Sequence, residues 1–299
     1  MQKKKLIIVV GPTASGKSDL TFQIAKDLSY QIVVCDAFQV YQEISRGINK
    51  PDAKALKEIR HHFVNHISIF EAWNIKRFKN EFDTLMQNNL NTKFILEGGS
   101  NLYIDCLINN YNIKAIDSNL SFDHLSNEEL YSKLYELDSV EALKIGNNNR
   151  KRLLQALKII YSNNFLKKSE LDKKNLEPLY DFFIIKKEVE REKLYQKINL
   201  RAQKMFDNNW RQEVVQLIEK HGDKITNLNA FKAIGYDEIY HSIIEKRETN
   251  LELIKQKTRQ YAKRQETWIN NKFKIDFKFK SYNQYQQLLA AIYNFWNDK

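Results

Sequence analysis

The stretch GPTASGKS, residues 11–18, has the form G-x-x-x-x-G-K-S/T of a loop whose backbone N–H groups cradle phosphates. It follows KLIIVV (5–10), a short apolar run that favours a buried parallel strand. Four apolar residues after the loop share one helical face: Leu20, Ile24, Ala25 and Leu28. This strand–loop–helix setting predicts a true phosphate site. It leaves open whether the phosphates belong to ATP or to another substrate.

Two further strands are predicted, QIVVCDA (31–37) and KFILEGGS (93–100). The order strand, helix, strand favours an α/β fold with a doubly wound parallel sheet. Amphipathic patterns then predict helices over 127–138 and 150–162, and YDFFIIKKE (180–188) predicts a returning strand. From there to the C-terminus we expect helices.

The composition indicates a globular protein that does not span a membrane. Of 299 residues, 42% are hydrophobic and 28% charged, and no apolar run approaches the roughly 18 residues that a membrane span needs. The start, MQKKKLIIVVGP, faintly resembles a signal peptide, but its short apolar run leads directly into the loop and is better interpreted as the first strand. With only Cys35 and Cys106, a disulfide framework is not expected, which favours the cytoplasm.

A formal net charge of +11 is compatible with a polyanionic partner, although a Lys- and Asn-rich composition also produces it. The stretch KQKTRQYAKRQETW (255–268) predicts a basic helix with Lys255, Arg259 and Lys263 on one face. Tyr261 and Trp268 add stacking surfaces for nucleic acid. A solvated charged helix explains the same spacing equally well.

Two carboxylates end predicted strands, where ligands bind in open parallel sheets. Asp36 is a candidate general base or Mg²⁺-holding group, and its alternative is to cap a turn. Glu97 is a candidate for the acid that organises Mg²⁺ and water in a nucleotide triphosphatase. Lys17 would supply a charge to the phosphates, and the Ser18 hydroxyl would ligate Mg²⁺.

The stretch HHFVNH (61–66) raises the question of a metal site, because His62 and His66 would share a face if this stretch were helical. No Cys or carboxylate stands at a convincing ligand spacing. We therefore expect histidines with structural or polar contacts.

Several stretches in order resemble the tRNA dimethylallyltransferase (isopentenyl-diphosphate:tRNA transferase) family. They are GPTASGKS (11–18), CDAFQVYQEISRGINKP (35–51), HHFVNHISIFEAWNIKRF (61–78), LEGGSNLYI (96–104), RLLQALKI (152–159), INLRAQKMF (198–206), AIGYDEI (233–239) and TRQYAKRQETW (258–268). Any one of them is weak evidence, but the ordered set spans nearly the whole chain and is specific.

The resemblance implies a P-loop core in residues 1–111 and 149–299, interrupted by a short helical, tRNA-clamping insertion over 112–148. The second core segment would include a helical tRNA-binding C-terminal part. The implied reaction moves the dimethylallyl group of dimethylallyl diphosphate to the N6 amine of adenosine 37 of tRNA, beside the anticodon. The expected cofactor is Mg²⁺, and the expected protein is a cytoplasmic monomer.

The resemblance also assigns residues. The catalytic set would be Asp36, as the base, with Thr13, Lys17 and Arg201. The diphosphate would lie on Gly11, Pro12, Thr13, Ala14, Ser15, Gly16, Lys17, Ser18 and Arg201, with Mg²⁺ on Ser18 through the diphosphate. The tRNA would contact Asp36, Ala37, Phe38, Gln39, Ser100, Lys151, Arg152, Leu153, Leu154, Gln155, Lys232, Ala233, Ile234, Gly235, Tyr236, Asp237, Arg259, Lys263, Arg264 and Gln265.

Some positions depart from the family pattern. Ala37 replaces a Ser, Ser18 stands where Thr is commoner, Glu97 replaces a small or apolar residue, and Gln155 stands where Arg is usual. The stretch between Tyr103 and Arg152 is shorter than usual, and a zinc-binding C-terminal module is missing.

Two other interpretations remain open. A small-molecule kinase using ATP would explain the loop and Glu97, but not the basic helix or the ordered motifs. A non-catalytic RNA-binding protein would explain the charge, but it leaves Lys17 and Asp36 without a role.

Overall fold

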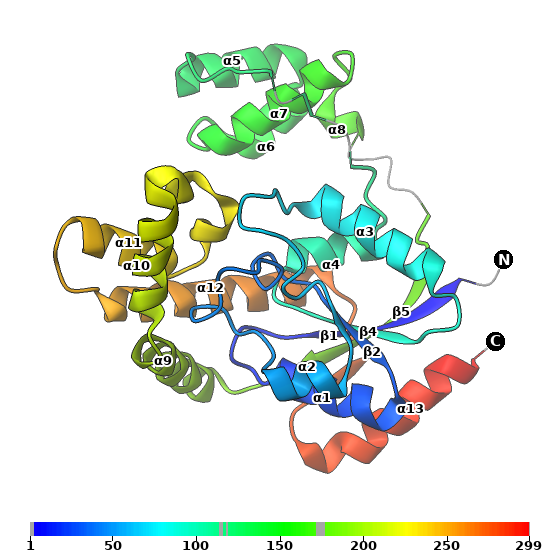
Figure 1. Ribbon diagram of the computed structural model, residues 1–299. Helices are drawn as coiled ribbons and strands as arrows, with labels where there is room; N and C mark the ends of the chain where they lie inside the picture. The colour runs from blue at the N-terminus through cyan, green and yellow to red at the C-terminus, as the bar shows by residue number, and fades with distance from the viewer. Residues whose placement is uncertain (1–2, 114–115, 118, 172–176, 299) are drawn as a thin grey trace. The chain divides into compact units, whose positions relative to one another are not determined.

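The computed structural model describes residues 3–113, 116–117, 119–171 and 177–298. Its centre is a sheet of six paired parallel strands in the order β3-β2-β4-β1-β5-β6 (Figure 1). The strands are β1 Lys4–Val10, β2 Gln31–Val34, β3 His61–His62, β4 Phe94–Glu97, β5 Tyr180–Lys187 and β6 Phe277–Phe279. The predicted α/β class and parallel sheet are therefore confirmed.

Helices connect and cover these strands. Before β5 they are α1 Lys17–Leu28, α2 Ala53–Glu58, α3 Ile75–Asn88, α4 Asn101–Ile108, α5 Asn127–Leu137, α6 Ser139–Ile145, α7 Arg150–Ser162 and α8 Lys168–Leu171. After it come α9 Arg191–Asp207, α10 Trp210–His221, the 3-10 helices Gly222–Asn227 and Asn229–Lys232, α11 Tyr236–Ile244, α12 Leu251–Lys272, the 3-10 turn Tyr282–Gln284 and α13 Tyr285–Asn297.

The sheet is buried on both faces, which explains the continuous apolar runs in its strands. Ile7 and Val9 of β1 pack with α1 and α13 on one face. Leu6 and Ile8 point to the other face, in the cluster that contains Phe78 of α3 and residues of α4. Figure 1 shows these two helix pairs on opposite sides of the strands. Alternating side chains of one strand thus serve two cores.

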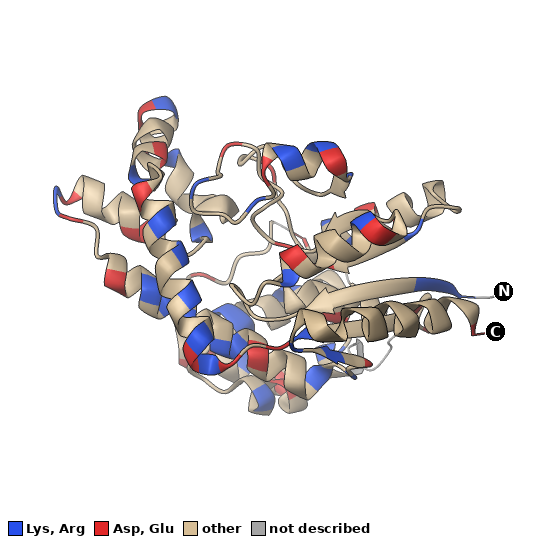
Figure 2. Cartoon of the chain, turned by 90° about the horizontal axis from the view of Figure 1, so that it is seen from below, with Lys and Arg blue, Asp and Glu red and all other residues tan. Residues whose placement is uncertain are grey.

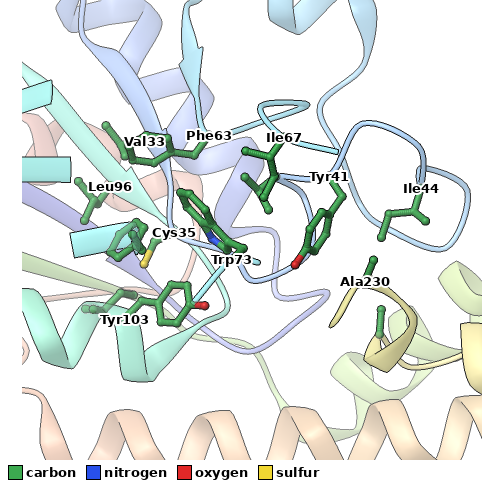
Figure 3. Packing of buried hydrophobic residues seen from close by; sticks show 14 of the residues in the cluster. Val33, Cys35, Tyr41, Ile44, Phe63, Ile67, Trp73, Leu96, Tyr103 and Ala230 are labelled. Atoms are coloured by element: carbon green, nitrogen blue, oxygen red, sulfur yellow. The ribbon is translucent and has the colours of Figure 1, made fainter. Parts of the chain in front are cut away.

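The larger core holds the loop after β2 in place. Val33 and Cys35 pack in this core with Leu96 of β4. Tyr41 and Trp73, from the segments after β2 and β3, are buried in the same core (Figure 3). Cys35 and Cys106 are both buried and are not joined in a disulfide. Because β1, β2 and β4 are parallel neighbours, the segments after Val10, Val34 and Glu97 all leave from one edge of the sheet.

The chain divides into two compact units, one formed by 1–108 and 180–299 and the other by Asn109–Leu179. The second unit has its own core, in which Leu130 and Leu134 of α5 pack with Leu153 and Leu157 of α7. This unit is longer than the 112–148 expected for the insertion, because α7 shares the core of α5. Residues 114–115 and 118 of that expected segment lie outside the described residues.

The structure adds two edge strands that the sequence pattern did not predict, β3 and β6. β3 has two residues and is too short to give a periodic pattern in the sequence. Because His62 lies in this strand, the helical conformation considered for His62 and His66 is wrong. β6 has three residues and pairs with β5 from Ile185 to Lys187, within a stretch in which helices were expected to dominate. Tertiary pairing decides the conformation of such short segments.

Candidate active site

The loop 11–18 joins β1 to α1 and leaves polar groups unused. Gly16 has φ +86°, a left-handed conformation that disfavours other residues, and it precedes α1 without a side-chain cap. The first N–H groups of α1 thus remain open to an anion. The Ser15 hydroxyl is buried and has no hydrogen-bond partner among the described residues. This geometry is compatible with the phosphate cradle that the sequence predicts, and phosphate binding itself stays a prediction.

Thr13 is the point where the loop meets the C-terminal helices. Arg201 of α9 donates a hydrogen bond from Nη2 to the Thr13 hydroxyl. The Thr13 N–H donates to Oε1 of Gln265 on α12 at 2.8 Å, and Nε2 of Gln265 donates to the Gly99 carbonyl at 2.9 Å. Tyr261, one turn earlier on α12, donates to the same carbonyl at 3.0 Å. The phosphate loop, the segment after β4 and two helices are thereby linked through hydrogen bonds.

Asp36 fixes a turn, which is one of the two alternatives that the sequence left open, and its role as a base or Mg²⁺ ligand stays a prediction. Its Oδ1 accepts the N–H groups of Phe38 at 2.8 Å and Gln39 at 3.2 Å, which fixes the turn after β2. Its Oδ2 lies toward Gly99, where a Cβ atom would stand 3.5 Å from it. One oxygen therefore orients the carboxylate, and Asp36 still lines the cavity at this edge of the sheet.

A cavity of about 340 Å³, hereafter the central cavity, joins these groups. This volume lies within the range of small-molecule sites. Its polar lining comprises Thr13, Lys17, Ser18, Asp36, Gln39, Asn49, Arg201, Lys232, Thr258, Tyr261, Arg264 and Gln265. Its apolar lining comprises Phe38, Ile48, Ile198, Ala202, Met205, Trp210, Ala233, Ile234 and Ile254. The cavity thus combines side chains of the loop 11–18 with an apolar wall.

Two cations of the central cavity, Lys17 and Arg201, are partly removed from water. Burial lowers the pKa of Lys17, while Glu97 and Asp36 oppose the shift and Arg201 adds to it. Burial also lowers the pKa of Arg201 to about 10, against the opposing effect of Asp36. A bound anion would favour the charged forms of both side chains. Lys17 and Arg201 are therefore candidate partners for a negatively charged ligand.

Trp210 is a cavity residue that the sequence reasoning missed. Cβ atoms added at Gly47 or Gly235 would each stand 2.0 Å from its indole ring, so both positions require glycine for this packing. Gly235 also has φ +102°. Tyr236 and Glu213 secure the same contact, because Tyr236 donates to Glu213 Oε1 at 2.7 Å and accepts the Gly47 N–H at 3.2 Å. Gly47 and Gly235 both lie in the stretches that resemble the family, and they were the sequence features that could have indicated this packing.

The residues expected at tRNA fall into three groups. Gln39, Gly235, Tyr236 and Gln265 are buried in the first unit, and Leu153 is buried in the core of the second. Lys232, Asp237, Lys263 and Arg264 are exposed in the first unit, as are Lys151, Arg152 and Gln155 in the second. Asp36, Ala37, Phe38, Ser100, Leu154, Ile234 and Arg259 are partly buried, and Ala233 is buried beside the cavity. Burial favours positioning roles for the first group, and exposure leaves the second accessible to a large partner.

The basic face predicted on α12 is partly occupied within the protein. Arg259 donates to Asn199 of α9 at 2.7 Å and to Glu252 at 2.9 Å, and Lys255 donates to Gln203 at 3.3 Å. Lys263 is exposed. Figure 2 shows basic segments recurring along several helices with acidic segments between them. The net charge is thus distributed rather than confined to one helix.

The histidines make polar contacts, as expected. His62 Nε2 lies 2.7 Å from Gln31 Oε1, His61 Nδ1 lies 2.8 Å from the Ile59 carbonyl, and His66 Nε2 lies 2.6 Å from Glu81 Oε2. Within the described residues, no group of three or more His, Cys, Asp or Glu side chains is arranged to hold a metal ion. No helix in that same part of the chain is long and apolar enough to cross a membrane.

Comparison with known proteins agrees with this geometry. A model of the family described as IPP transferase matches residues 39–272. The chain is similar to the tRNA dimethylallyltransferase of Malacoplasma penetrans (strain HF-2), with 66% identity over 99% of each chain. Among solved structures, it resembles the tRNA delta(2)-isopentenylpyrophosphate transferase of Staphylococcus epidermidis, with 29% identity, a TM-score of 0.68, and coverage of 98% of this chain and 99% of that one. It also resembles a eukaryotic dimethylallyltransferase acting on tRNA, with 25% identity, a TM-score of 0.83, and coverage of 98% and 79%. The chain therefore belongs to the IPP transferase family.

Proposed function

We propose that the chain transfers the dimethylallyl group of dimethylallyl diphosphate to the N6 amine of the adenosine 3′-adjacent to the tRNA anticodon, at position 37, and releases diphosphate. The observation that carries this proposal is the central cavity, in which a phosphate loop, a carboxylate and an apolar wall converge. The name and the high identity of the Malacoplasma penetrans relative support it.

The loop is proposed to hold the diphosphate of the prenyl donor rather than a nucleotide. Its open N–H groups, with Lys17 and Arg201, would bind phosphate oxygens. The apolar residues of the same cavity would accommodate the five-carbon group of the donor. Thr13 would orient Arg201 through the hydrogen bond between their side chains.

The reaction is a substitution at the allylic carbon. The carbon–oxygen bond to diphosphate breaks and its electron pair leaves with the diphosphate, while the adenine amine supplies the electrons of the new carbon–nitrogen bond. Lys17, Arg201 and the loop N–H groups would stabilise the departing charge. Asp36 would orient the amine and accept its proton at Oδ2, since Oδ1 already accepts two backbone N–H groups.

The site contains the hard oxygen donors that Mg²⁺ prefers. The Ser18 hydroxyl lines the central cavity, beside the proposed position of the diphosphate oxygens. Mg²⁺ usually binds through one or two protein oxygens together with substrate phosphates and water, so this donor set fits the ion. Ser18 would hold it beside the diphosphate, where the chemistry that the ion supplies is neutralisation of the leaving group's charge.

The adenine must leave its stack in the anticodon loop to reach Asp36, which costs a few kcal/mol. Contacts in the central cavity would offset this cost, and exposed cations such as Lys263 and Lys232 would attract the tRNA backbone. We also propose that the protein acts in the cytoplasm as a monomer; the residues that line the central cavity all come from one copy of the chain.

The test is incubation of nucleotide-free protein with labelled dimethylallyl diphosphate, unmodified tRNA and Mg²⁺. The expected result is label on N6 of a single adenosine beside the anticodon, with release of one diphosphate per transfer. In a parallel assay with added ATP, transfer of its phosphoryl group to a small molecule would instead identify a kinase. Tight tRNA binding without any transfer would identify an RNA-binding protein.

A further inference from the structure

Glu97, the last residue of β4, is a buried carboxylate to which the reaction above assigns no role. It is only 4% exposed, and its Oε2 has no hydrogen-bond partner among the described residues. Burying a carboxylate without full compensation is costly, and native proteins seldom retain such a group without a reason. The orphan oxygen therefore indicates a ligand that the protein chain itself does not supply.

The sheet places this carboxylate beside the phosphate loop. Glu97 pairs in register with Val9 of β1 on one side and with Val34 of β2 on the other. β1 leads into the loop, and Ser18 lies in the first turn of the helix that follows. Glu97 thus stands at the carboxyl end of the strand next to the one that enters the loop.

Two cavities meet at Ser18. It lines the central cavity, and together with Glu97 it also lines a second cavity of about 610 Å³. Both residues therefore face a common space that borders the proposed position of the diphosphate. The other carboxylates along this second cavity are less deeply buried: Asp19 is exposed, and Glu58 is paired with Lys26 at 2.6 Å.

The electrostatic setting of Glu97 favours a cation. Burial raises the pKa of this carboxyl group, and the nearby Lys17 together with the hydroxyl groups of Ser18 and Thr21 opposes the shift. Lys17 is itself half-buried, and it would be drawn to the diphosphate in the substrate complex. A divalent cation beside Glu97 would then compensate the carboxylate directly.

We propose that Glu97 and Ser18 together hold the divalent cation that accompanies the diphosphate, with Glu97 as the carboxylate member of the site. The identity of the anion rests on the proposed function, whereas the cation site rests on the orphan oxygen and its neighbour. Phosphate loops of nucleotide triphosphatases hold Mg²⁺ in a comparable way, with a loop hydroxyl and an acidic residue. Here the same pair of groups serves a leaving diphosphate.

The experiment measures Mn²⁺ binding, by the loss of the free-ion electron paramagnetic resonance signal, in the presence of inorganic diphosphate and without tRNA or prenyl donor. Glu97→Gln should weaken Mn²⁺ binding by about 10- to 100-fold, the usual effect of losing a group that supports a metal site. Glu58→Gln is the matched control, since it makes the same chemical change in a residue of the same cavity, and its affinity should stay within twofold of the wild type. An unchanged affinity in Glu97→Gln would overturn the proposal and indicate a protonated, structural Glu97.

A second variant separates ligation from folding. Glu97→Asp keeps the carboxylate and should bind Mn²⁺ more tightly than Glu97→Gln, although more weakly than the wild type. If the Asp and Gln variants bind Mn²⁺ equally and both retain the wild-type circular dichroism spectrum, the carboxylate does not hold the ion. Because no transfer step enters this assay, normal Mn²⁺ binding with no prenyl transfer would refute the proposed function and leave the cation site standing.

Discussion

The charged groups of this protein form two sets with different surroundings. The inner set, Lys17, Asp36 and Arg201, lines the central cavity, and burial shifts the pKa values of its two cations. The outer set, Lys151 and Lys263, is exposed. Charges in a water-poor site interact strongly and specifically, whereas exposed charges are screened by salt. The inner set is therefore suited to bond breaking, and the outer set to attracting a polyanion.

The helix α12 shows a similar contrast between an exposed and a buried polar side chain within three residues. Lys263 is exposed, whereas Gln265 is 3% exposed and uses both ends of its amide on Thr13 and Gly99. A stretch that the family resemblance assigned as a whole to tRNA thus contains one residue facing solvent and one that supports the phosphate loop. The following variants test whether these positions differ in function as they differ in burial.

Asp36→Asn should have the largest effect. Loss of the proton acceptor should slow the chemical step by about two to four orders of magnitude, while tRNA affinity changes far less. Single-turnover transfer with saturating tRNA measures the step, and Asp19→Asn, an exposed carboxylate beside the loop, is the control. Transfer within threefold of the wild type would remove Asp36 from its assigned role.

Lys17→Ala should follow closely. Losing one donor to a developing anion costs roughly 10²- to 10³-fold in kcat, and this loss should appear in transfer but not in tRNA binding. Lys26→Ala, on the exposed side of the same helix, should leave transfer nearly unchanged. Equal losses of transfer and tRNA affinity in Lys17→Ala would show that Lys17 also contributes to tRNA binding, and would contradict the functional distinction between the inner and outer sets.

Gln265→Met should have an intermediate effect. The substitution keeps the side-chain volume but leaves the Thr13 N–H and the Gly99 carbonyl without their partner, which should cost about 1–3 kcal/mol in unfolding free energy. Misplacement of the loop should lower transfer by about tenfold or more. We expect tRNA affinity to be retained; a selective loss of tRNA affinity with normal transfer at saturating tRNA would instead favour a direct RNA contact.

Lys263→Ala should have the smallest effect. If Lys263 neutralises one tRNA phosphate, the slope of log affinity against log salt concentration should fall by about one unit. Transfer at saturating tRNA should remain normal. The comparison variant is Lys278→Ala, which removes an exposed charge on β6 and should leave the slope unchanged. An identical slope in Lys263→Ala would argue against a phosphate contact there.

The sequence was sufficient to predict the central strands and the loop, because β1, β2, β4 and β5 contain short apolar runs and β1 leads directly into the loop motif. It was insufficient for β3 and β6, which exist only through pairing with neighbours. In the site, the motif predicted Lys17 and Ser18 and the strand end predicted Asp36. Trp210 was not predicted, because its place in the cavity depends on close packing against Gly47, which lies far from it in the chain. Tyr236 was expected at tRNA, but its burial and its hydrogen bonds to Gly47 and Glu213 could not be inferred from the motif.

The central claim is that the loop holds a prenyl diphosphate instead of a nucleotide. It is tested most directly by the initial rate of dimethylallyl transfer to tRNA in nucleotide-free protein with Mg²⁺, with and without added ATP. Breaking the allylic carbon–oxygen bond needs charge stabilisation but no phosphoryl transfer, so transfer should proceed without ATP. Added ATP should only compete with the prenyl diphosphate, because the cradle recognises phosphates in general. An absolute requirement for ATP, or release of one ADP per turnover, would contradict this account.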